Sequence, residues 1–278
     1  MTMWDGSEKT GSGRGSRALA TGRVHRGAEV RLRVAQIVTL SILLVTWQWV
    51  SGDVVNPLFI SDPLSVIRRL YGWTANGSIF IHGGITLYEA LVGFVFGSVV
   101  GILLGIVLGT STFLSRLLNP YIFAFNALPK IALAPLIVLW VGLGYDSKIV
   151  FVAIVVFFLA FFNTFVGVRE VDVDLIDTIR VMKANRWQVL TKVVIPSART
   201  WIFAGLQMSV PYALIGAILG EMIAADAGLG HLLVRAGAAS DTTGVFAALV
   251  VVGVLAVLIN QILDKFQRRF DAWKVIAV

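Results

Sequence analysis

The sequence predicts an all-α membrane protein with six transmembrane helices, and three observations carry that prediction. The composition is too apolar for a soluble domain, because 57% of the 278 residues are hydrophobic, only 14% are charged, and the mean hydropathy is +0.85. Six apolar runs are long enough to cross about 30 Å of hydrocarbon as helices. Basic residues gather in the polar segments between these runs, which is the bias that sets membrane orientation.

The N-terminal part combines a polar tail with the first apolar run. Residues 1–32 are rich in Gly, Ser, Thr and Arg without apolar periodicity, so they are expected to form a disordered cytoplasmic tail. The run at residues 34–50 lacks a small-x-small cleavage site and follows a long basic tail, which favours a retained span over a signal peptide. Trp47 and Trp49 are expected to anchor this span at the interface.

A short helix is expected between the first and second spans. In the segment NPLFISDPLSVIRRLYGW, Asp62 and Pro63 are typical of a helix start. The apolar spacing that follows suits a helix that lies in the membrane interface or packs beneath other helices.

Five further spans and their flanking charges define the predicted topology. The spans are expected at about Thr86–Gly109, Tyr121–Gly142, Lys148–Val168, Trp201–Ile223 and Val245–Leu263. With six spans both termini share one side, and nearly all basic residues then fall on that side. Only Arg68, Arg69, Lys148 and Arg235 fall on the opposite side, and Lys130 lies inside a span. The positive-inside bias therefore places both termini and residues 169–199 in the cytoplasm.

The second span carries a glycine at every fourth position. These residues are Gly93, Gly97, Gly101, Gly105 and Gly109. At this spacing they form one smooth helix face that another backbone can approach closely. Close helix packing is the expected role, and a face that slides during a transport cycle is a second interpretation compatible with it.

The polar segment at residues 169–199 lies between two apolar spans and is longer than the usual connection of about 4 to 6 residues. Asp172 and Asp174 favour a helix start through capping and the helix dipole. The apolar and basic residues that follow predict short amphipathic helices, ended by Pro196 before the next span. The segment is therefore expected to be a docking surface, and a solvated loop is the alternative.

Part of this segment resembles a known loop. The string LIDTIRVMKANRWQVLTKVVIP is similar to the EAA loop of the permease subunits of binding-protein-dependent ABC importers. The Glu position of that loop corresponds to Asp177, its two Ala positions to Thr178 and Ile179, its Gly position to Lys183, and its final Pro to Pro196. The spacing of the loop is kept, while most of the named residue types differ.

Further motifs extend the resemblance from about Ser61 to Trp273. The strings NPYIFAFNALPKIALAPLIVLWVGLGYDSKI, NTFVGVREVD, ALIGAILGEMIAADAGLGHLL and DKFQRRFDAW are similar, in order and spacing, to the nitrate, sulfonate and taurine type of these permeases. Several motifs in one order are more specific than a single loop.

The resemblance implies a fold, partners and a location. Residues 33–278 would form a transmembrane permease domain with the type I ABC importer (MetI-like) fold, in the bacterial plasma (inner) membrane. This domain would form a homodimer with a second copy of itself, among membrane lipid. It would pair with two cytoplasmic ABC ATPase subunits, which would hold ATP and Mg, and would receive a small anionic or polar solute from an extracytoplasmic solute-binding protein.

The resemblance also implies a set of residues that couple the permease to the ATPase. They are Asp177, Thr178, Ile179, Arg180, Met182, Lys183, Ala184, Asn185, Arg186 and Trp187. In this loop Lys183 replaces a Gly that tolerates a positive φ. One hypothesis is that Asn185 takes the left-handed conformation instead, since Asn tolerates it better than most residues. Another is that Lys183 pairs with an acidic residue of the ATPase.

The expected chemistry of this chain is mechanical. No GxxxxGK[ST] phosphate loop is present, so ATP hydrolysis is expected on another chain. His25, His82 and His231 lack the HExxH spacing, and Cys is absent, so no metal, cofactor or catalytic residue is expected. Basic residues flank the apolar runs and do not form one patch with interleaved aromatics, which argues against nucleic-acid binding. The alternatives are a secondary transporter without an ATPase, or a membrane scaffold subunit.

The third span is expected to line a translocation pathway. Lys130 lies between Pro129 and Pro135, where the helix is expected to be interrupted. Charged groups and broken helices at this depth usually line a cavity. The hypothesis is that Lys130 offers positive charge to an anionic substrate, and the alternative is that it snorkels or pairs with Glu89 or Glu221.

The fifth span supplies further candidates. Glu221 near its outer end is expected to form part of a gate, to dock the binding protein, or to make a structural hydrogen bond. Pro211 is expected to kink this span. The complete set of predicted pathway residues is Asn126, Pro129, Lys130, Pro135, Asn163, Gln207, Pro211 and Glu221.

Overall fold

The computed structural model describes residues 13–56 and 58–271, and the side chains described begin at residue 31. It is built from helices and divides into two units, residues 1–64 and 65–278. Within the described residues, five helices are long and apolar enough to cross a membrane. A sixth span is obtained when the bent pair at residues 112–127 and 130–141 is counted as one. The predicted all-α membrane fold is therefore confirmed.

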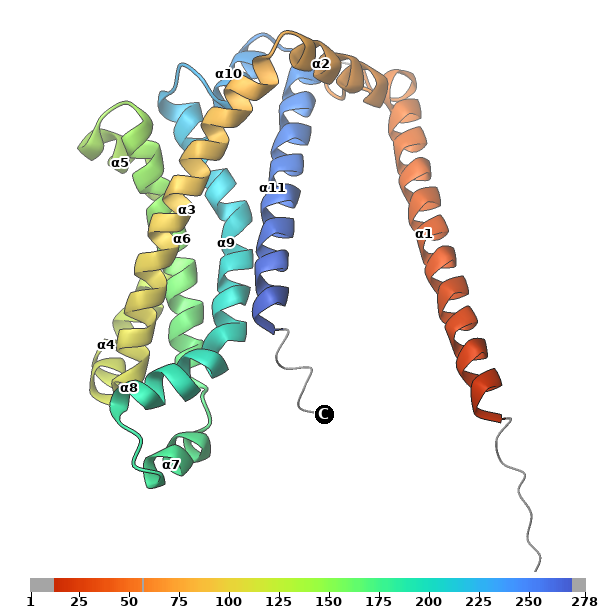
Figure 1. The fold of residues 1–278 in the computed structure, drawn as a ribbon. Coiled ribbons are helices and arrows are strands. Elements are labelled where there is room, and N and C mark those ends of the chain that lie inside the picture. The colour runs from red at the N-terminus through yellow and green to blue at the C-terminus, as the bar shows by residue number, and fades with distance from the viewer. Residues whose placement is uncertain (1–12, 57, 272–278) are drawn as a thin grey trace, which may run out of the picture. The chain divides into compact units, whose positions relative to one another are not determined.

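The first unit consists mainly of α1, at Gly13–Asp53, whose helical angles break at Ser51 and Gly52 (Figure 1). The structure differs here from the predicted tail at residues 1–32, because it continues the helix back to Gly13. Arg and Ala are frequent in this stretch and favour helix, although Gly13, Gly15, Gly22 and Gly27 do not. Residues 1–12 lie outside the described residues.

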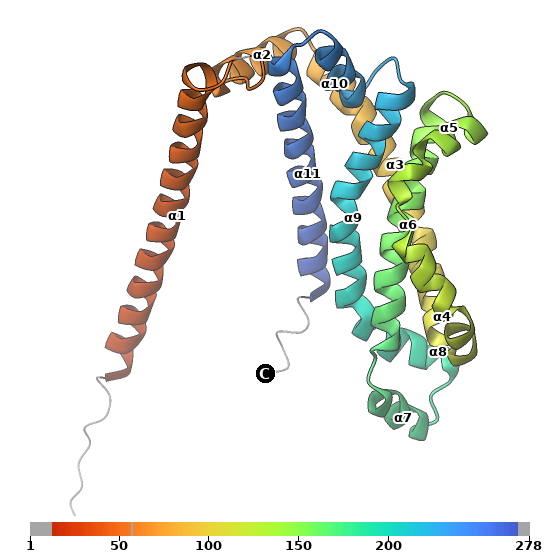
Figure 2. The ribbon, with the colours of Figure 1, turned by 180° about the vertical axis from the view of Figure 1, so that it is seen from behind.

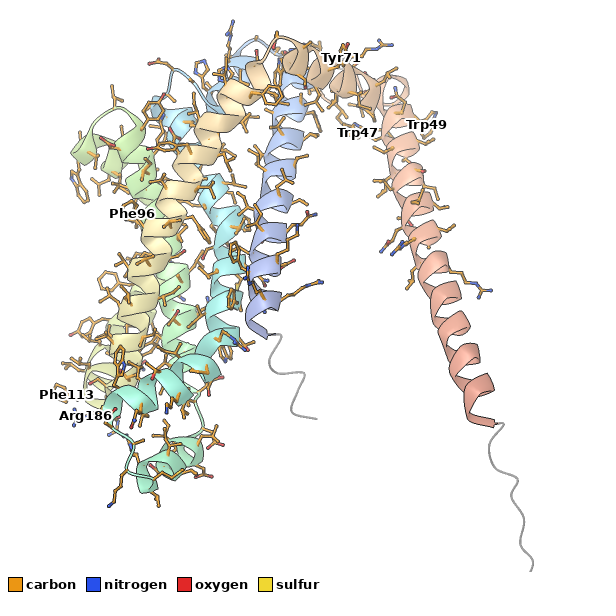
Figure 3. The ribbon with its side chains drawn as sticks, in the orientation of Figure 1. Trp47, Trp49, Tyr71, Phe96, Phe113 and Arg186 are labelled. Carbon is orange, nitrogen blue, oxygen red and sulfur yellow. The ribbon has the colours of Figure 1, made fainter. Side chains whose placement is uncertain are left out.

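The end of α1 is stabilised by the segment that follows it. The Trp47 Nε1–H donates to the Ser61 carbonyl at 2.7 Å, and the Ser51 hydroxyl donates to the Ile60 carbonyl at 2.8 Å. Trp49 on the same helix end is 62% exposed, as expected for an interfacial anchor (Figure 3).

The second unit is a bundle whose centre is formed by α3 at Ser78–Thr110, α6 at Tyr145–Arg169 and α9 at Ile195–Ala224. Helix α3 packs along α6, and α6 packs along α9 (Figures 1 and 2). Helix α11, at Thr242–Asp271, packs on α9 and α10. The core between these helices contains Val152, Val156 and Leu214, all almost fully buried.

The predicted glycine face of α3 is the contact with α6. A Cβ atom at Gly97 would lie 2.3 Å from the Ala153 carbonyl oxygen, and one at Gly101 would lie 2.8 Å from that of Phe157. Gly93, Gly105 and Gly109 are equally close to α6 side chains. The expectation of close helix packing is therefore confirmed, because only glycine leaves room for the two backbones.

The third predicted span is interrupted, as expected from its prolines. It consists of α4 at Thr112–Ala127, a 3₁₀ turn at Lys130–Leu133 and α5 at Ala134–Val141. The two parts are bent by 80° at the break. Leu128 precedes Pro129, which favours extended backbone at Leu128, and it ends α4 with φ −65° and ψ 137°.

Three shorter helices lie at the ends of the bundle. Helices α7 at Val173–Val181 and α8 at Arg186–Val189 lie at the same end as the C-terminus of α11 (Figure 1). Helix α10, at Leu229–Ala238, lies at the opposite end. The expected helix before the second span is α2, at Pro63–Ala75, and its Arg69 pairs with Asp241 ahead of α11.

Candidate functional sites

The polar segment at residues 169–199 forms two short helices with defined starts. Asp172 is the N-cap of α7, and its Oδ1 accepts from the Asp174 amide at 2.9 Å, as predicted. Asn185 is the N-cap of α8 in a capping box with Gln188. The Asn185 Oδ1 accepts from the Gln188 amide, and the Gln188 Oε1 accepts from the Asn185 amide, each at 2.8 Å.

The bend between α7 and α8 is made by Lys183. Its φ is 62°, in the left-handed region, while Asn185 is extended with φ −76° and ψ 168°. The Lys183 amide donates to the Arg180 carbonyl, and the Ala184 amide donates to the Ile179 carbonyl. These two bonds define a Schellman motif, in which Lys183 takes the place usually held by glycine. The prediction that Asn185 would be left-handed is wrong, because Asn185 caps α8 and a cap requires extended backbone.

The ten predicted coupling residues divide between two faces. Ile179 and Ala184 pack inward on a cluster formed by Val168, Val171, Val189, Val194 and Ala198. Met182 and Trp187 point outward and are 77% and 69% exposed. The other exposed members are Asp177, Thr178, Arg180, Lys183, Asn185 and Arg186, and Figure 3 labels Arg186 at this end of the bundle.

The outward face combines large apolar side chains with basic ones. Val181, next to Met182, is 83% exposed, so the exposed large apolar side chains of this segment are Val181, Met182 and Trp187. Arg180, Lys183 and Arg186 supply positive charge, and the described acidic partner among them is Asp177, 3.3 Å from Arg180. We call Val181, Met182, Trp187 and these three basic residues the exposed coupling face.

The second helix of the segment continues directly into α9. Residues Leu190–Val194 form a π-helical turn, and the Ile195 amide donates to the Leu190 carbonyl. Residues 186–224 therefore form one helical run of 39 residues. The prediction that Pro196 ends the short helices is wrong. Pro196 lies in the first turn of α9, where a missing N–H disturbs the helix least, and the wider π turn accommodates it.

Replacing Lys183 with glycine is expected to raise stability by up to about 1 kcal/mol, because the left-handed conformation costs a residue with a Cβ about 1–2 kcal/mol. The thermal unfolding midpoint of the purified protein in detergent measures this. The neighbouring Ala184→Gly is the matched control, and it is expected to lower the midpoint, because Ala184 has no positive φ to relieve. A Lys183→Gly protein that is less stable than the parent would contradict the assignment.

Lys130 is held at the break of the third span. Its Nζ donates to the Asn126 carbonyl at 2.7 Å and lies 5.3 Å from the centre of the Phe158 ring. The Asn126 carbonyl is free for this bond because α4 ends one residue later. Glu89 pairs with Lys148 and Glu221 bonds to Thr86 and Gly230, so the predicted pairing of Lys130 with either carboxylate is wrong, while snorkelling of Lys130 stays a prediction. Pro129 and Pro135 are exposed on either side of the turn.

The remaining predicted pathway residues lie apart from Lys130. Asn163 donates back to the Leu159 carbonyl of its own helix and packs against Gly205 of α9. Gln207 donates to Asp264 and Gln267, and so links α9 to α11. Pro211 is exposed, and α9 continues through it as one helix. The structure thus brings together Asn126 and Lys130, but not the whole predicted set.

Glu221 belongs to a buried charged network that joins α3, α6 and α9. The Glu221 Oε1 accepts from the Thr86 hydroxyl at 2.7 Å, and its Oε2 accepts from the Gly230 amide at 2.6 Å. Beside it, the Lys148 Nζ lies 3.0 Å from the Glu89 Oε1, and all three charged side chains are at most 4% exposed. The structural hydrogen bond proposed for Glu221 is confirmed.

Sequence reasoning missed the role of Lys148, which it assigned to the outer boundary of a span. The signal was Glu89, because a carboxylate inside an apolar run requires a cation from another span. Lys148 lies in the first turn of α6, at the level where Glu89 lies on α3. A Cβ at Gly220 would lie 2.9 Å from the Lys148 Cγ, so a glycine on α9 makes room for this side chain.

The same network holds the turn before α10. The Gly228 amide donates to the His82 Nδ1 at 3.0 Å, and the Leu229 amide donates to the Thr86 hydroxyl at 2.9 Å. Together with the bond from Gly230 to Glu221, three consecutive amides at the start of α10 are bound by side chains of α3 and α9. The turn is thereby fixed to the outer end of the bundle.

Comparison with known proteins places these features in a family. The model of the family described as "binding-protein-dependent transport system inner membrane component" matches residues 97–274. The riboflavin transport system permease protein RibX of Chloroflexus aurantiacus is 36% identical over 240 residues, which are 85% of this chain and 89% of that protein. The taurine transport system permease protein TauC of Escherichia coli is 29% identical over 84% of this chain and 88% of its own length.

A further relative and a solved structure agree with this placement. The putative aliphatic sulfonates transport permease protein SsuC of Bacillus subtilis is 29% identical over 84% of this chain and 85% of its own length. The inward-facing MetNI methionine ABC transporter contains a chain that matches with a TM-score of 0.57 and 22% identity. That match covers 71% of this chain and 96% of the solved chain, and supports the fold alone.

Proposed function

We infer the function of this chain from its family, since the chain belongs to the binding-protein-dependent transport system inner membrane components. It is the transmembrane permease subunit of an ABC importer in the bacterial inner membrane. Its partners are an ABC ATPase and a solute-binding protein. We propose that ATP and Mg are held by two cytoplasmic copies of that ATPase and that this chain carries no ATP site.

We propose that the transported solute is small and anionic or polar. The support is the isolated positive charge of Lys130 at the break of the third span, together with relatives described as permeases for aliphatic sulfonates and taurine. A second copy of this chain and membrane lipid are the proposed partners of the exposed apolar helix faces. Phe96 on α3 and Val254 on α11 are 63% and 53% exposed on such faces.

The observation that carries the coupling proposal is the exposed coupling face. Three exposed large apolar side chains in a segment with three exposed basic ones are typical of a protein interface, and they favour a partner surface that is both apolar and acidic. The face is rigid at its base, because Ile179 and Ala184 are packed in the cluster below it. Its second helix is continuous with α9, so movement of the partner is transmitted to a membrane span without an intervening loop.

Removing apolar side chains of the coupling face is expected to separate the permease from its ATPase. The double variant Met182→Ala and Trp187→Ala removes two exposed side chains, each of which contributes about 1.5 kcal/mol or more when buried at an interface. At least a tenfold loss of ATPase co-purifying with the tagged permease is expected. Tyr71→Ala is the control, because Tyr71 is 76% exposed at the opposite end of the bundle (Figure 3).

This experiment separates the proposed role from its alternatives. A secondary transporter or a scaffold subunit would retain its properties in the double variant, since neither needs a cytoplasmic ATPase. Full co-purification of the ATPase with the double variant, at parental stability, would show that α7 and α8 are not the docking site.

A further inference from the structure

A cavity of about 310 Å³ lies between α3, α4 and α6, and the proposed function does not yet use it. Its volume falls at the lower end of the range of about 300–1,000 Å³ that is typical of small-molecule sites. Aromatic side chains dominate the lining, with aliphatic side chains from α3 and α4 and one amide, from Asn126. The aromatic members are Tyr121, Phe125, Phe157, Phe158, Phe161 and Phe162.

The rings around this cavity are held by one another. Phe157 and Phe161 are stacked with centres 5.6 Å apart, and Phe157 meets Phe158 edge to face at 5.2 Å. Phe125 of α4 is stacked on Phe158 at 6.4 Å. These contacts hold the faces and edges of the rings in position to contact a further ring in the cavity. Such aromatic pairs contribute about 0.5–1.5 kcal/mol beyond the area that they bury.

One cation lies beside this aromatic cavity. The Lys130 Nζ lies 5.3 Å from the centre of Phe158 and 2.7 Å from the carbonyl of Asn126, and both of these residues line the cavity. An ammonium has three N–H donors, and the bond to Asn126 uses one of them. The remaining donors suit an anionic group at the mouth of the cavity.

The position of this cation argues against a lipid chain as the occupant. A charged side chain and an interrupted backbone within a span are tolerated mainly where they face protein or a polar cavity. An acyl chain alone would fill the aromatic space but would leave the ammonium without an anion, so a lipid occupant would have to bring its phosphate to Lys130, an outcome that the decanesulfonate competition below detects. A small inorganic anion would satisfy Lys130 but would leave the aromatic cavity empty.

We propose that the cavity is a subsite for the ring of a small aromatic anion in transit, with the anionic group at Lys130. This inference rests on the proposed function, and it restricts the transported solutes to organic anions with an apolar ring. Phe158 is the specificity-determining residue, since it faces both the ring space and the ammonium.

Equilibrium binding of radiolabelled benzenesulfonate to the permease–ATPase complex in lipid nanodiscs tests the proposal. Ethanesulfonate has the same anionic group without a ring and is expected to compete at least tenfold more weakly. Lys130→Gln and Phe158→Leu are each expected to weaken benzenesulfonate binding at least tenfold, while Lys130→Arg keeps most of it. Phe113→Leu, at an exposed phenylalanine on α4 outside the cavity lining, is the matched control and is expected to bind as the parent does (Figure 3).

Several outcomes would overturn the subsite. If ethanesulfonate competed as well as benzenesulfonate, the ring would have no role in binding. If Lys130→Gln bound benzenesulfonate as the parent does, the charge would have none. Displacement by decanesulfonate that is indifferent to Lys130→Gln would identify a lipid-chain groove. A change of oligomeric state in Phe158→Leu would identify contact with a second copy. If the complex assembles and hydrolyses ATP but does not bind benzenesulfonate, the subsite proposal fails and the proposed permease function stands. If the permease binds benzenesulfonate but does not assemble with the ATPase, the proposed function fails and the subsite stands.

Discussion

Gly97→Ala is expected to lower the thermal unfolding midpoint of the permease in detergent by about 2–12 °C. The new methyl carbon would lie 2.3 Å from the Ala153 carbonyl oxygen and 3.0 Å from the Phe157 amide nitrogen. Both are backbone atoms of α6, so neither moves aside without separating α3 from α6. Overpacking of this kind costs about 1–3 kcal/mol, and each kcal/mol moves the midpoint of a domain of 150–250 residues by about 2–4 °C.

The same substitution at Gly84 is the matched control. Gly84 lies on the same helix, and a Cβ there would meet nothing within 4 Å. Alanine favours helix over glycine by about 1 kcal/mol, so Gly84→Ala is expected to leave the midpoint unchanged or to raise it. If both variants behaved alike, the close approach of α3 and α6 would not be the cause.

Lys148→Met is expected to cost about 3–5 kcal/mol, because it leaves the Glu89 carboxylate buried without its cation. The loss is measured as a fall in the unfolding midpoint and in the yield of monodisperse protein. The second variant, Lys148→Met with Glu89→Gln, is expected to recover most of it, since the amide no longer places a charge in the core. Recovery by the double variant distinguishes loss of a charge pair from loss of packing.

An exposed lysine supplies the control for this experiment. Lys192 lies on the π-helical turn, and Lys192→Met is expected to change the free energy of unfolding by no more than about 0.5 kcal/mol, as surface substitutions usually do. If Lys148→Met also stayed within that range, the ion pair would not support the outer end of the bundle.

Much of the fold follows from local patterns in the sequence. Five of the apolar runs and the break near Pro129 follow from hydropathy and from the missing N–H of proline. The contact of Gly97 with α6 follows from spacing, and the cap at Asp172 follows from side-chain chemistry. These predictions depend on neighbours along the chain and need no knowledge of the tertiary structure.

The features that escaped prediction depend on other elements. Lys183 adopts a left-handed conformation because Asn185 is committed to the cap of α8, and residue propensity alone does not predict which of two positions two residues apart takes which conformation. Lys148 is buried because Glu89 on α3 and the gap at Gly220 on α9 receive it. The helix through Pro196 depends on a π turn, which lacks a recognisable sequence signal.

The predicted pathway residues show the same limit. Asn126 and Lys130 are four residues apart, and the end of α4 brings the carbonyl of one to the ammonium of the other. Asn163, Gln207 and Glu221 were selected only as polar residues inside spans, and each instead bonds to a different neighbour. Polarity identifies which side chains need a partner, but the partner is set by helix packing.

The continuity of α8 with α9 has a mechanical consequence. Helix α9 has 30 residues and is about 45 Å long. It begins at the turn joined to the exposed coupling face, and near its other end Glu221 is bonded to Thr86 of α3 and to the start of α10. Because residues 186–224 form one continuous helical run, a displacement of the exposed coupling face acts directly on the helix whose far end is bonded to α3 and to α10.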